Sequence, residues 1–505
     1  MSRPSSWVGL AALLVPVAVS CPAAAQANYR STPTGGRSAL MGNTGVVFAR
    51  DGSAPYLNPA TIAAIDESSV AFSVNFYSYA HSRYSAWHQP GPVDAKQFGA
   101  LSLGNTYNTQ DAFDALPSTV CLFFTIGKWS GPLPQEKAPL DKPRRRRQKL
   151  ALCLGTVERD STSFPAVNYG STAGGVSSEQ SQSFLRNWSR FQAGPSWSGN
   201  LTDKLALGVS LHGIYTTYSV SWTSNNITLG PGDKAISSGL DSDVDARSFD
   251  LAAVAGLTYR LGKGLALGLS AQSPSAHVVS YLNGSLRSQF SGPTDYVQLE
   301  NGNGSFSAPS PFRIALGFGA ETARLKIEVN QTLFVPQGSS LSANVQEDTV
   351  TVANGASSSV PGVASFRERT GAVVDSAVGL EYFLTPTLSV LGGMSTDFSA
   401  SPPLPATIQP SLGTFYQERM QRALVSLGVG SYGDATELLL GTQLGYGWGK
   451  ALAVDGFVLP NEFATVNKSI YSAIFIIGGN VSLDALQRTL VKMQHLVIPG
   501  PRAPQ

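Results

Sequence analysis

Residues of the types used in catalysis occur in this chain, but their spacing forms no familiar reactive group. The histidines are scattered, with no His-x-x-x-His pair and no Cys/His cluster of the kind that binds zinc. Neither the Gly-x-Ser-x-Gly turn of serine hydrolases nor a phosphate-binding loop occurs. We therefore expect no catalytic residue, no metal and no cofactor, and the chain is not predicted to be an enzyme. The histidines are His81, His88, His212, His277 and His495.

One serine and histidine pair, Ser210 and His212, has side-chain types that a lipase uses. Their spacing of two places both side chains on one face of a strand. A phospholipase embedded in a membrane would need that face to point towards lipid, whereas the surrounding pattern predicts that it points inward. The pair is therefore a weak indication of an enzyme.

Three alternating aspartates, Asp241, Asp243 and Asp245, resemble the start of a calcium-binding loop. However, Ala246 and Ala252 stand where such a loop needs its glycine and its bidentate glutamate, so an EF-hand is excluded. Two interpretations remain, a solvated turn and an improvised divalent-cation site at the surface.

The overall composition favours a membrane barrel over a soluble protein. Only 13% of the 505 residues are charged, about half of ordinary usage, and 51 are glycine. A barrel tolerates so few charges because lipid covers its outer wall. The net charge of +2, without a basic patch that contains stacking aromatics, gives no indication of nucleic-acid binding.

The N-terminus has the features of a secretory signal peptide, for which we take residues 1–25. Arg3 precedes an apolar run over residues 7–19, and three small residues, Ala23, Ala24 and Ala25, form a cleavage site. Cys21 leaves a lipoprotein as an alternative. No later run of about 18 apolar residues exists, so spanning helices are not expected.

Alternating hydrophobicity predicts a series of transmembrane β-strands. In residues 251–259 the odd positions are apolar, and Asp250, Gly256, Thr258 and Arg260 on the other face are polar or small. A membrane strand of about 9–11 residues alternates in this way, apolar towards lipid and polar towards the lumen. We place fourteen such strands near residues 68–78, 118–128, 149–158, 185–198, 204–221, 248–260, 264–280, 311–319, 324–335, 370–383, 387–399, 416–430, 435–448 and 468–480.

The connections between these segments alternate between short and long. Turns of a few residues follow positions 199, 260, 319, 383 and 430, and between them we expect long polar loops at 222–247, 281–310, 336–369, 400–415 and 449–467. Bacterial outer-membrane barrels have short periplasmic turns and long outer loops, and an even strand count returns both termini to the periplasm. A soluble sandwich would not alternate so regularly. Residues 285–300 could form an extra strand, but we assign them to an outer loop.

A short stretch before the first strand differs from the rest of the chain. Residues 36–64 are rich in small residues, and Gly42 and Gly45 permit tight bends. Asp51-x-Ser53 follows, and then Asn58-Pro59-Ala60, in which proline biases Asn58 towards an extended conformation. Such a segment suits close packing inside a cavity, and the alternative is a disordered linker.

These motifs, together with the hairpin texture of the rest of the chain, resemble the outer-membrane long-chain fatty-acid transporters, the FadL family, with its aromatic-hydrocarbon channels. The resemblance implies an all-β fold, a 14-stranded antiparallel transmembrane β-barrel (residues 67–481) with an N-terminal hatch (residues 26–66) inside the lumen. It implies hatch motif residues Gly42, Gly45, Asp51, Ser53, Asn58, Pro59 and Ala60. It also implies lateral exit at a kink in the third strand, where Gly155 could supply the bend.

The function that follows is passive, ligand-gated transport of hydrophobic molecules, such as long-chain fatty acids or related apolar compounds, across the outer membrane of a Gram-negative-type bacterium. The expected partners are the hydrophobic ligand, membrane lipid and lipopolysaccharide, with no nucleic acid, and we expect a monomer. A general diffusion porin and a structural or adhesive surface barrel are the alternatives.

Three features depart from this pattern or leave a choice open. Leucines recur at helical spacing after the last strand, which predicts an amphipathic helix over 482–494 within a C-terminal extension, residues 482–505. The expected turn at 129–148 is long and contains Arg144, Arg145, Arg146 and Arg147, either a solvated run or a contact with anionic headgroups. Cys121 and Cys153 lie on neighbouring predicted strands and are either disulfide-bonded or two small apolar wall residues.

Overall fold

The structure is a computed structural model that describes residues 28–30, 32–65, 67–85, 107–126, 148–171, 177–229, 235–291, 295–335, 341–353, 355–368, 370–404, 407–408, 418–455 and 462–487. The predicted signal peptide and the four consecutive arginines lie outside these residues. None of the helices in this part of the chain is long and apolar enough to cross a membrane.

Strands make up one closed antiparallel sheet. The strands are β1 (Ser69–Ser85), β2 (Tyr107–Ile126), β3 (Gln148–Ser171), β4 (Ser177–Asn200), β5 (Leu205–Leu229), β6 (Ala235–Gly262), β7 (Leu265–Gln272), β8 (Ala276–Ser291), β9 (Tyr296–Ser307), β10 (Phe312–Glu321), β11 (Leu325–Val335), β12 (Leu341–Ala353), β13 (Ala356–Glu368), β14 (Val373–Thr385), β15 (Leu388–Asp397), β16 (Thr407–Ile408), β17 (Glu418–Tyr432), β18 (Thr436–Asp455) and β19 (Glu462–Ser482). The pairing of β1 with β19 closes the barrel, and Ser69 lies opposite Ser482, so the sheet begins and ends at one end of the barrel.

Four strands of the barrel are interrupted at one height. β7 and β8 both pair with β6, which makes them two parts of one strand. β9 and β10 are likewise two parts of one strand, and so are β11 and β12, and β13 and β14, because each part pairs with the corresponding part of the neighbouring strand. With each pair counted once and the two-residue β16 left out, the barrel has fourteen strands, and all fourteen predicted segments are confirmed.

The membrane-level part of the barrel carries an apolar outer belt. Leu211, Leu251 and Leu269 are 53%, 40% and 41% exposed, whereas the intervening side chains of the same strands, such as Ser210 and Ser270, are buried towards the lumen. At the edge of this belt Tyr446 stacks on Trp448 and makes a tilted ring contact with Tyr471. Apolar residues this exposed are stable only against lipid, and a cluster of aromatic residues is typical of the membrane interface.

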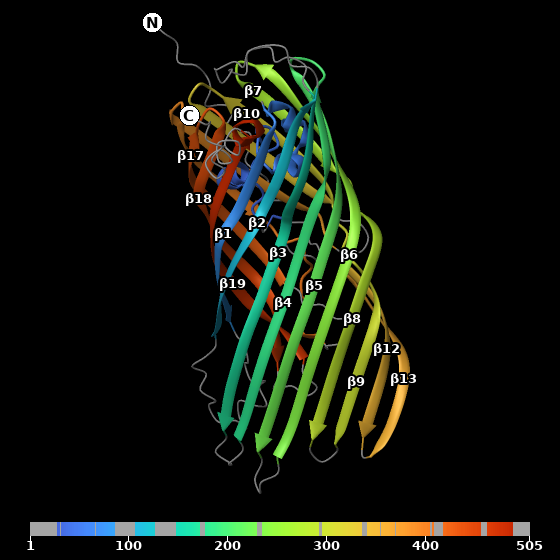
Figure 1. Cartoon of the computed structure of the whole chain (residues 1–505). Coiled ribbons are helices and arrows are strands. Elements are labelled where there is room, and N and C mark those ends of the chain that lie inside the picture. Colours follow the sequence, from blue (N-terminus) through green and yellow to red (C-terminus); the bar gives the residue numbers. More distant parts are fainter. Residues whose placement is uncertain are drawn as a thin grey trace, which may run out of the picture.

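The short turns are confirmed, but the long outer loops predicted at 222–247, 281–310, 336–369 and 449–467 are wrong, because β18 and β19 also continue to Asp455 and from Glu462. In the loop predicted at 400–415, the described residues 400–404 form no strand and 407–408 form the short β16. Residues 222–229 continue β5, residues 235–247 belong to β6, and residues 281–310 and 336–369 contain β8, β9, β12 and β13. Residues 285–291 and 296–300, which we assigned to an outer loop, belong to the paired strands β8 and β9. Figure 1 shows these strands running far beyond the rest of the barrel, and we call this part the outer extension.

The extension escaped sequence-based prediction because its hydrophobic pattern is inverted. Along β6, Leu240 and Val244 point inward and are buried, whereas Asp241 and Asp243 point outward and are exposed. Outside the membrane the outer face meets water, so apolar residues move to the inner face. The three aspartates therefore belong to the outer face of a strand and not to a turn.

Two remaining expectations concern the cysteines and the C-terminus. Cys121 and Cys153 lie directly opposite each other on β2 and β3 and form a disulfide, with Cα atoms 4.2 Å apart. Only residues 483–487 are helical in the described part of the predicted 482–494 helix, and Leu486 is 41% exposed.

Candidate functional site: a cavity between the N-terminal segment and the barrel wall

The N-terminal residues 28–65, which we call the hatch segment, lie inside the barrel. The segment contains α1 (Gly36–Leu40), α2 (Ala54–Leu57) and the 3-10 helix η2 (Pro59–Ala64). Its elements contact strands on opposite sides of the sheet, β18 and β19 for α1 and β4 to β6 for η2. Figure 1 shows the segment, in blue, within one end of the barrel.

Glycines let the hatch segment approach the wall at backbone distance. Gly42 has a φ of 66°, and a Cβ there would lie 2.5 Å from the backbone nitrogen of Met394. Wall glycines face the segment in turn. Gly268 meets the carbonyl of Val46, and Gly208 meets the backbone of Pro59. Gly45, with a φ of 149°, packs instead against Ser38 within the segment. Small residues on both surfaces thus replace side-chain packing by backbone contact.

Asp51 organises the fold of the hatch segment itself. Its carboxylate accepts bonds from the backbone N–H groups of Arg37 at 2.7 Å and Ser38 at 3.3 Å, at the start of α1. The same carboxylate accepts from the Ser53 N–H at 3.1 Å and hydroxyl at 2.5 Å. Asp51 and Ser53 therefore join α1 to α2, which gives the Asp-x-Ser spacing a physical reason.

Asn58 joins the hatch segment to itself and to the wall. Its side-chain oxygen accepts from the Ala60 N–H at 3.1 Å, which caps η2, while Pro59 occupies the first helical position. Its amide donates to the carbonyl of Val46 at 2.6 Å and to that of Leu257 on β6 at 3.1 Å. The Asn-Pro-Ala motif therefore starts η2 and also anchors the hatch segment to β6.

The wall supplies one anchor that the sequence did not predict. Glu328 of β11 is fully buried, and its carboxylate accepts three backbone N–H bonds from the hatch segment. The donors are Gly45 and Val47, each at 2.9 Å, and Phe48 at 3.0 Å. Glu328 looks like an ordinary inward polar residue of a strand, so only the fold identifies its role.

Arg37 makes the strongest ionic contact between the hatch segment and the wall. Its guanidinium forms ion pairs with Glu381 of β14 and, at 3.1 Å, with Glu437 of β18, and it donates to the Tyr432 hydroxyl at 2.9 Å. Burial lowers the pKa of Arg37, but Glu381, Tyr432 and Glu437 outweigh burial and raise the pKa well above its usual value. The cation is therefore permanent, and we call this group the latch.

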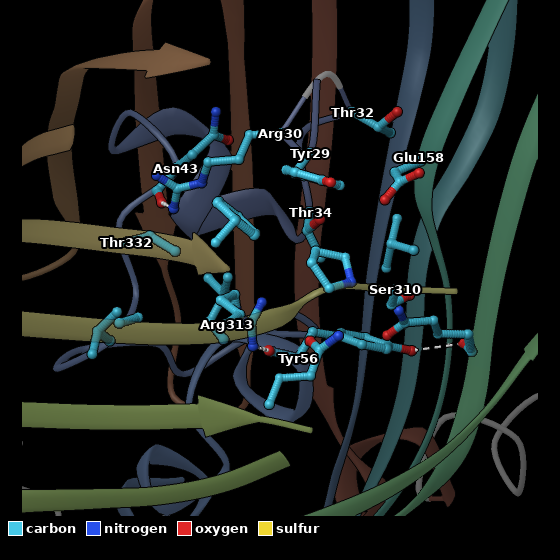
Figure 2. A pocket seen from close by; sticks show the side chains of 18 residues that line it. Tyr29, Arg30, Thr32, Thr34, Asn43, Tyr56, Glu158, Ser310, Arg313 and Thr332 are labelled. Atoms are coloured by element: carbon cyan, nitrogen blue, oxygen red, sulfur yellow. Dashed lines mark hydrogen bonds between the residues drawn. The ribbon is translucent and has the colours of Figure 1, made fainter. Parts of the chain in front are cut away.

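A cavity of about 80 Å³ lies between the other side of the hatch segment and the wall. Figure 2 shows Tyr29, Arg30 and Tyr56 of the hatch segment facing Arg313 of β10 and Glu158 of β3 across it. Apolar side chains complete the lining, among them Val46, Leu57, Val157 and Phe334. The cavity combines apolar walls with two cationic side chains, which suits an amphipathic anion.

Neither arginine of the cavity forms an ion pair within the described part of the chain. Arg30 donates to the Asn43 carbonyl at 2.8 Å, and Arg313 donates to the Tyr56 carbonyl. The Arg30 Nη1 and the Arg313 Nε are buried and have no hydrogen-bond partner. Burial lowers the pKa of Arg30, and nearby Asp375 and Asp397 compensate only in part. Buried donors without acceptors are uncommon in folded proteins.

The backbone pairing between β2 and β3 stops next to the cavity, and we call the unpaired part of the wall the slit. Their pairing runs from Ile126 and Gln148 to Thr119 and Gly155 and then stops, while β2 continues along β1 and β3 along β4. A bulge in β3 follows at Val157, two residues beyond Gly155. Gly155 lies against the ring of Tyr56, whose hydroxyl is 3.0 Å from where a Cβ would stand.

The N-terminal arm of the hatch segment, residues 28–30 and 32–34, bridges this slit. Ser118 of β2 donates from its hydroxyl to the Pro33 carbonyl at 2.7 Å. On the opposite side, the backbone N–H of Arg159 in β3 donates to the Thr32 hydroxyl at 2.9 Å. Each of the parted strands therefore contacts the arm in place of the other strand.

Several solved structures are similar to this chain over most of its length. A Pseudomonas aeruginosa FadL homologue is 14% identical, with a TM-score of 0.50 over 90% of this chain and 99% of that one. The toluene transporter TodX of P. putida is 13% identical, with a TM-score of 0.50 over 89% and 98% of the two chains. The chain shares the fold of these channels. The expected FadL-like resemblance is thus confirmed at the level of the fold.

A variant of TodX described as a monoaromatic hydrocarbon channel gives a TM-score of 0.51 at 12% identity, over 88% of this chain and 98% of that one. No protein-family model and no curated protein matches the sequence. The fold is therefore recognisable from the structure and not from overall sequence similarity.

Proposed function

We propose that the protein is a passive outer-membrane channel for hydrophobic molecules, which bind in the cavity beside the hatch segment and leave sideways through the opening between β2 and β3. The observation that carries this proposal is the end of β2–β3 pairing at Gly155, next to a cavity lined by Val157. A slit in the wall is useful to a solute that prefers lipid and useless to one that prefers water. The similar channels of known structure carry toluene and monoaromatic hydrocarbons.

We propose further that the ligand has an anionic head, as a long-chain fatty acid does. Arg30 and Arg313 line the cavity without an ion-pair partner in the described residues, and a carboxylate would accept bonds from both. The apolar tail would pass Val157 towards the slit. Return of the tail to hydrocarbon is worth roughly 0.8 kcal/mol per CH₂, so no energy source is needed.

Gating follows from the position of the arm. Because Thr32 and Pro33 bond to both edges of the slit, the arm must leave at least one edge before a ligand passes. Arg30 belongs to the same arm, two residues before Thr32, so a ligand that pairs with Arg30 also acts on the arm. This geometry supports a ligand-gated channel over a general porin, because the hatch segment occupies the bore, and over a purely adhesive barrel, which needs no slit.

The proposed placement has the hatch end of the barrel in the periplasm and the outer extension beyond the lipopolysaccharide layer. The exposed apolar belt defines the lipid-facing zone, and the aspartates on the outer face of β6 lie outside it. We retain residues 1–25 as a cleaved signal peptide, residues 26–66 as a movable hatch and a monomeric state as parts of this proposal.

Uptake of radiolabelled hexadecanoate by cells with and without the protein tests the function, with native mass spectrometry of mildly extracted protein as the second measurement. We expect faster uptake in cells with the protein and a co-purified lipidic ligand. Equal uptake in both strains and a ligand-free protein would exclude transport. Unchanged ion conductance after deletion of residues 26–64 would indicate an open porin instead.

A further inference from the structure

A short segment of the chain crosses the lumen between the outer extension and the cavity. Residues 398–404 follow β15, and at Thr407–Ile408 the chain pairs with β19, although β17 and β18 separate β15 from β19 in the sheet. Ala400 and Ser401 are 0% and 1% exposed, and Leu404 packs against the buried apolar cluster on the inner face of the extension. The segment therefore passes through the lumen and not over the outer face of the barrel. We call residues 398–404 the strap.

The sequence of the strap explains why β15 does not continue into the extension. Pro402 and Pro403 have no backbone N–H, and each proline biases the residue before it towards an extended conformation. Two consecutive prolines remove ladder hydrogen bonds, so a central strand ends before them. Ser399, Ala400 and Ser401 are small, and the backbone can therefore lie close to the wall. The strap is thus a thin, extended crossing that does not belong to the sheet.

The two ends of the strap contact two different apolar regions. Phe398 and Ala400 pack in one cluster with Tyr29 and Phe334, and both of these aromatic residues line the cavity. At the other end, Leu404 contacts the inner cluster of the extension. The strap therefore lies between the apolar inner face of the extension and the apolar side of the cavity. A hydrophobic molecule that follows the first surface meets the strap before it reaches the second.

The strap begins where the N-terminal arm of the hatch segment is held. Asp397, the residue directly before the strap, accepts from the Arg30 N–H at 3.0 Å through its carboxylate. Its carbonyl accepts from the Asn28 side-chain amide at 2.7 Å. A ligand that passes the strap therefore arrives beside Arg30, the cation that we propose as a receptor for its head.

Only a few hydrogen bonds hold the strap to the wall. Among the described residues they run from the Phe398 N–H to the Asp375 carboxylate of β14 at 2.8 Å, from the Ser399 N–H to the Gln421 side-chain oxygen of β17 at 3.3 Å, and from the Gly371 N–H to the Ala400 carbonyl at 3.2 Å. Between its two apolar ends the strap buries only small side chains. Segments with few hydrogen bonds and little buried apolar surface open locally at a low cost in free energy.

We propose that the strap is an inner lid, which a hydrophobic ligand displaces from β14 and β17 as it moves from the extension to the cavity. The inference rests on the proposed transport function and adds the residues that control entry. Asp375 and Gln421 hold the lid closed through its backbone, and Phe398 is the lid side chain that the ligand meets on the cavity side.

Labelling of a thiol on the strap tests whether the lid opens. Ser401→Cys is nearly isosteric and places a thiol at a buried position, while Cys121 and Cys153 are bonded to each other and Cys21 belongs to the predicted signal peptide. With purified protein, we expect hexadecanoate to accelerate labelling by a maleimide at least about fivefold. Ser270→Cys, at a position that is 0% exposed on the inner face of β7, is the matched control and should label slowly with and without hexadecanoate.

A variant that loosens the lid gives a test without ligand. Gln421→Ala removes the acceptor of the Ser399 N–H and should raise ligand-free labelling of Ser401→Cys about two- to tenfold, as expected for the loss of one hydrogen bond. Gln443→Ala is the control, because Gln443 bonds to Ser426 within the wall at 3.1 Å, and it should leave the labelling unchanged. In intact cells Gln421→Ala should also increase the initial rate of hexadecanoate uptake, by a similar factor.

The outcomes separate the lid from the transport proposal. If hexadecanoate uptake is equal in cells with and without the protein, while hexadecanoate still accelerates labelling of Ser401→Cys, transport fails and the lid stands. The lid is overturned if hexadecanoate and Gln421→Ala both leave this labelling unchanged. It is also overturned if labelling of Ser270→Cys accelerates by the same factor, because the whole barrel interior then opens and not the strap.

Discussion

The arginines on the two sides of the hatch segment have opposite electrostatic surroundings. Arg37 is surrounded by Glu381, Glu437 and Tyr432 and has its charge fully neutralised. On the other side, Arg30 and Arg313 share a cavity and bond to backbone carbonyls, with no ion pair in the described residues. The same side-chain type thus closes one side of the bore and leaves the other side ready for an anion. Arg37 is thus a structural contact, whereas the charge of Arg30 is compensated only in part, by Asp375 and Asp397.

The largest expected effect comes from removal of the latch. Arg37→Ala removes the closer cation from the buried Glu381 and leaves Lys326 at 3.9 Å. Removal of one partner of a buried ion pair costs about 3–5 kcal/mol. We expect the purified protein to conduct ions spontaneously in planar bilayers, because the hatch segment detaches from β14 and β18. Arg50→Ala is the control, since Arg50 is partly exposed and 4.0 Å from Glu321, and it should stay silent. A quiet Arg37→Ala channel would contradict the latch.

A smaller and more selective effect should follow from a change in the cavity. Arg313→Gln removes the cation and should weaken hexadecanoate binding by about 10–100-fold, since a hydrogen bond to a charged group contributes roughly 1.5–3 kcal/mol. Binding of hexadecanol, which has no charge, should change little. Isothermal titration in detergent measures both. An equal loss for the acid and the alcohol would show that Arg313 shapes the cavity and does not recognise a carboxylate.

Variants of Asn58 can distinguish its role as the cap of η2 from its role as the tether to the wall. Asn58→Ala loses the cap of η2 as well as the bonds to Val46 and Leu257, at a cost of roughly 1–2 kcal/mol. Asn58→Ser restores the cap alone and should recover about half of that loss. Deuterium exchange at the amides of residues 59–64 reports the difference. Identical exchange in both variants would mean that the tether to β6 carries the whole effect.

The smallest expected change is at Gly155. A Cβ at this position meets the Tyr56 hydroxyl at 3.0 Å and Thr119 at 3.1 Å, so Gly155→Ala must displace one of them slightly. Overpacking of this kind costs on the order of 1 kcal/mol. Because Tyr56 provides the carbonyl that holds Arg313, hexadecanoate affinity should fall by about fivefold, for a shift of that size. Unchanged affinity would show that Tyr56 and Arg313 move independently.

The membrane-level fold was readable from the sequence, because lipid imposes an apolar residue at every second position of each strand. The outer extension was not, since its apolar residues, such as Trp222 and Leu240, face inward and are separated by serines, asparagines and aspartates that resemble loop sequence. In β5 the apolar residues still occupy every second position, but they change from the outer to the inner face at residues 215–222. A search for this change of face would have revealed that β5 continues.

The site was readable only in part. Asp51, Ser53 and Asn58 bond within the hatch segment or close to it, and their spacing carried a signal. The latch and the cavity join residues that are distant along the chain, Arg37 with Glu381 and Arg30 with Arg313, and no local pattern marks such pairs. Gly155 stands two residues from the bulge, although the bend itself depends on Val157 and on the loss of pairing with β2.

The disulfide between Cys121 and Cys153 has a consequence for the size of the slit. It joins β2 and β3 two residue pairs from Thr119 and Gly155, where their pairing stops. A covalent link at that point prevents the two strands from separating further towards the hatch end. A wide solute can therefore enlarge the slit only on the side away from the disulfide. The edge of the slit next to the disulfide keeps its position on heating, on ligand binding and in less ordered lipid, for as long as the disulfide stays oxidised.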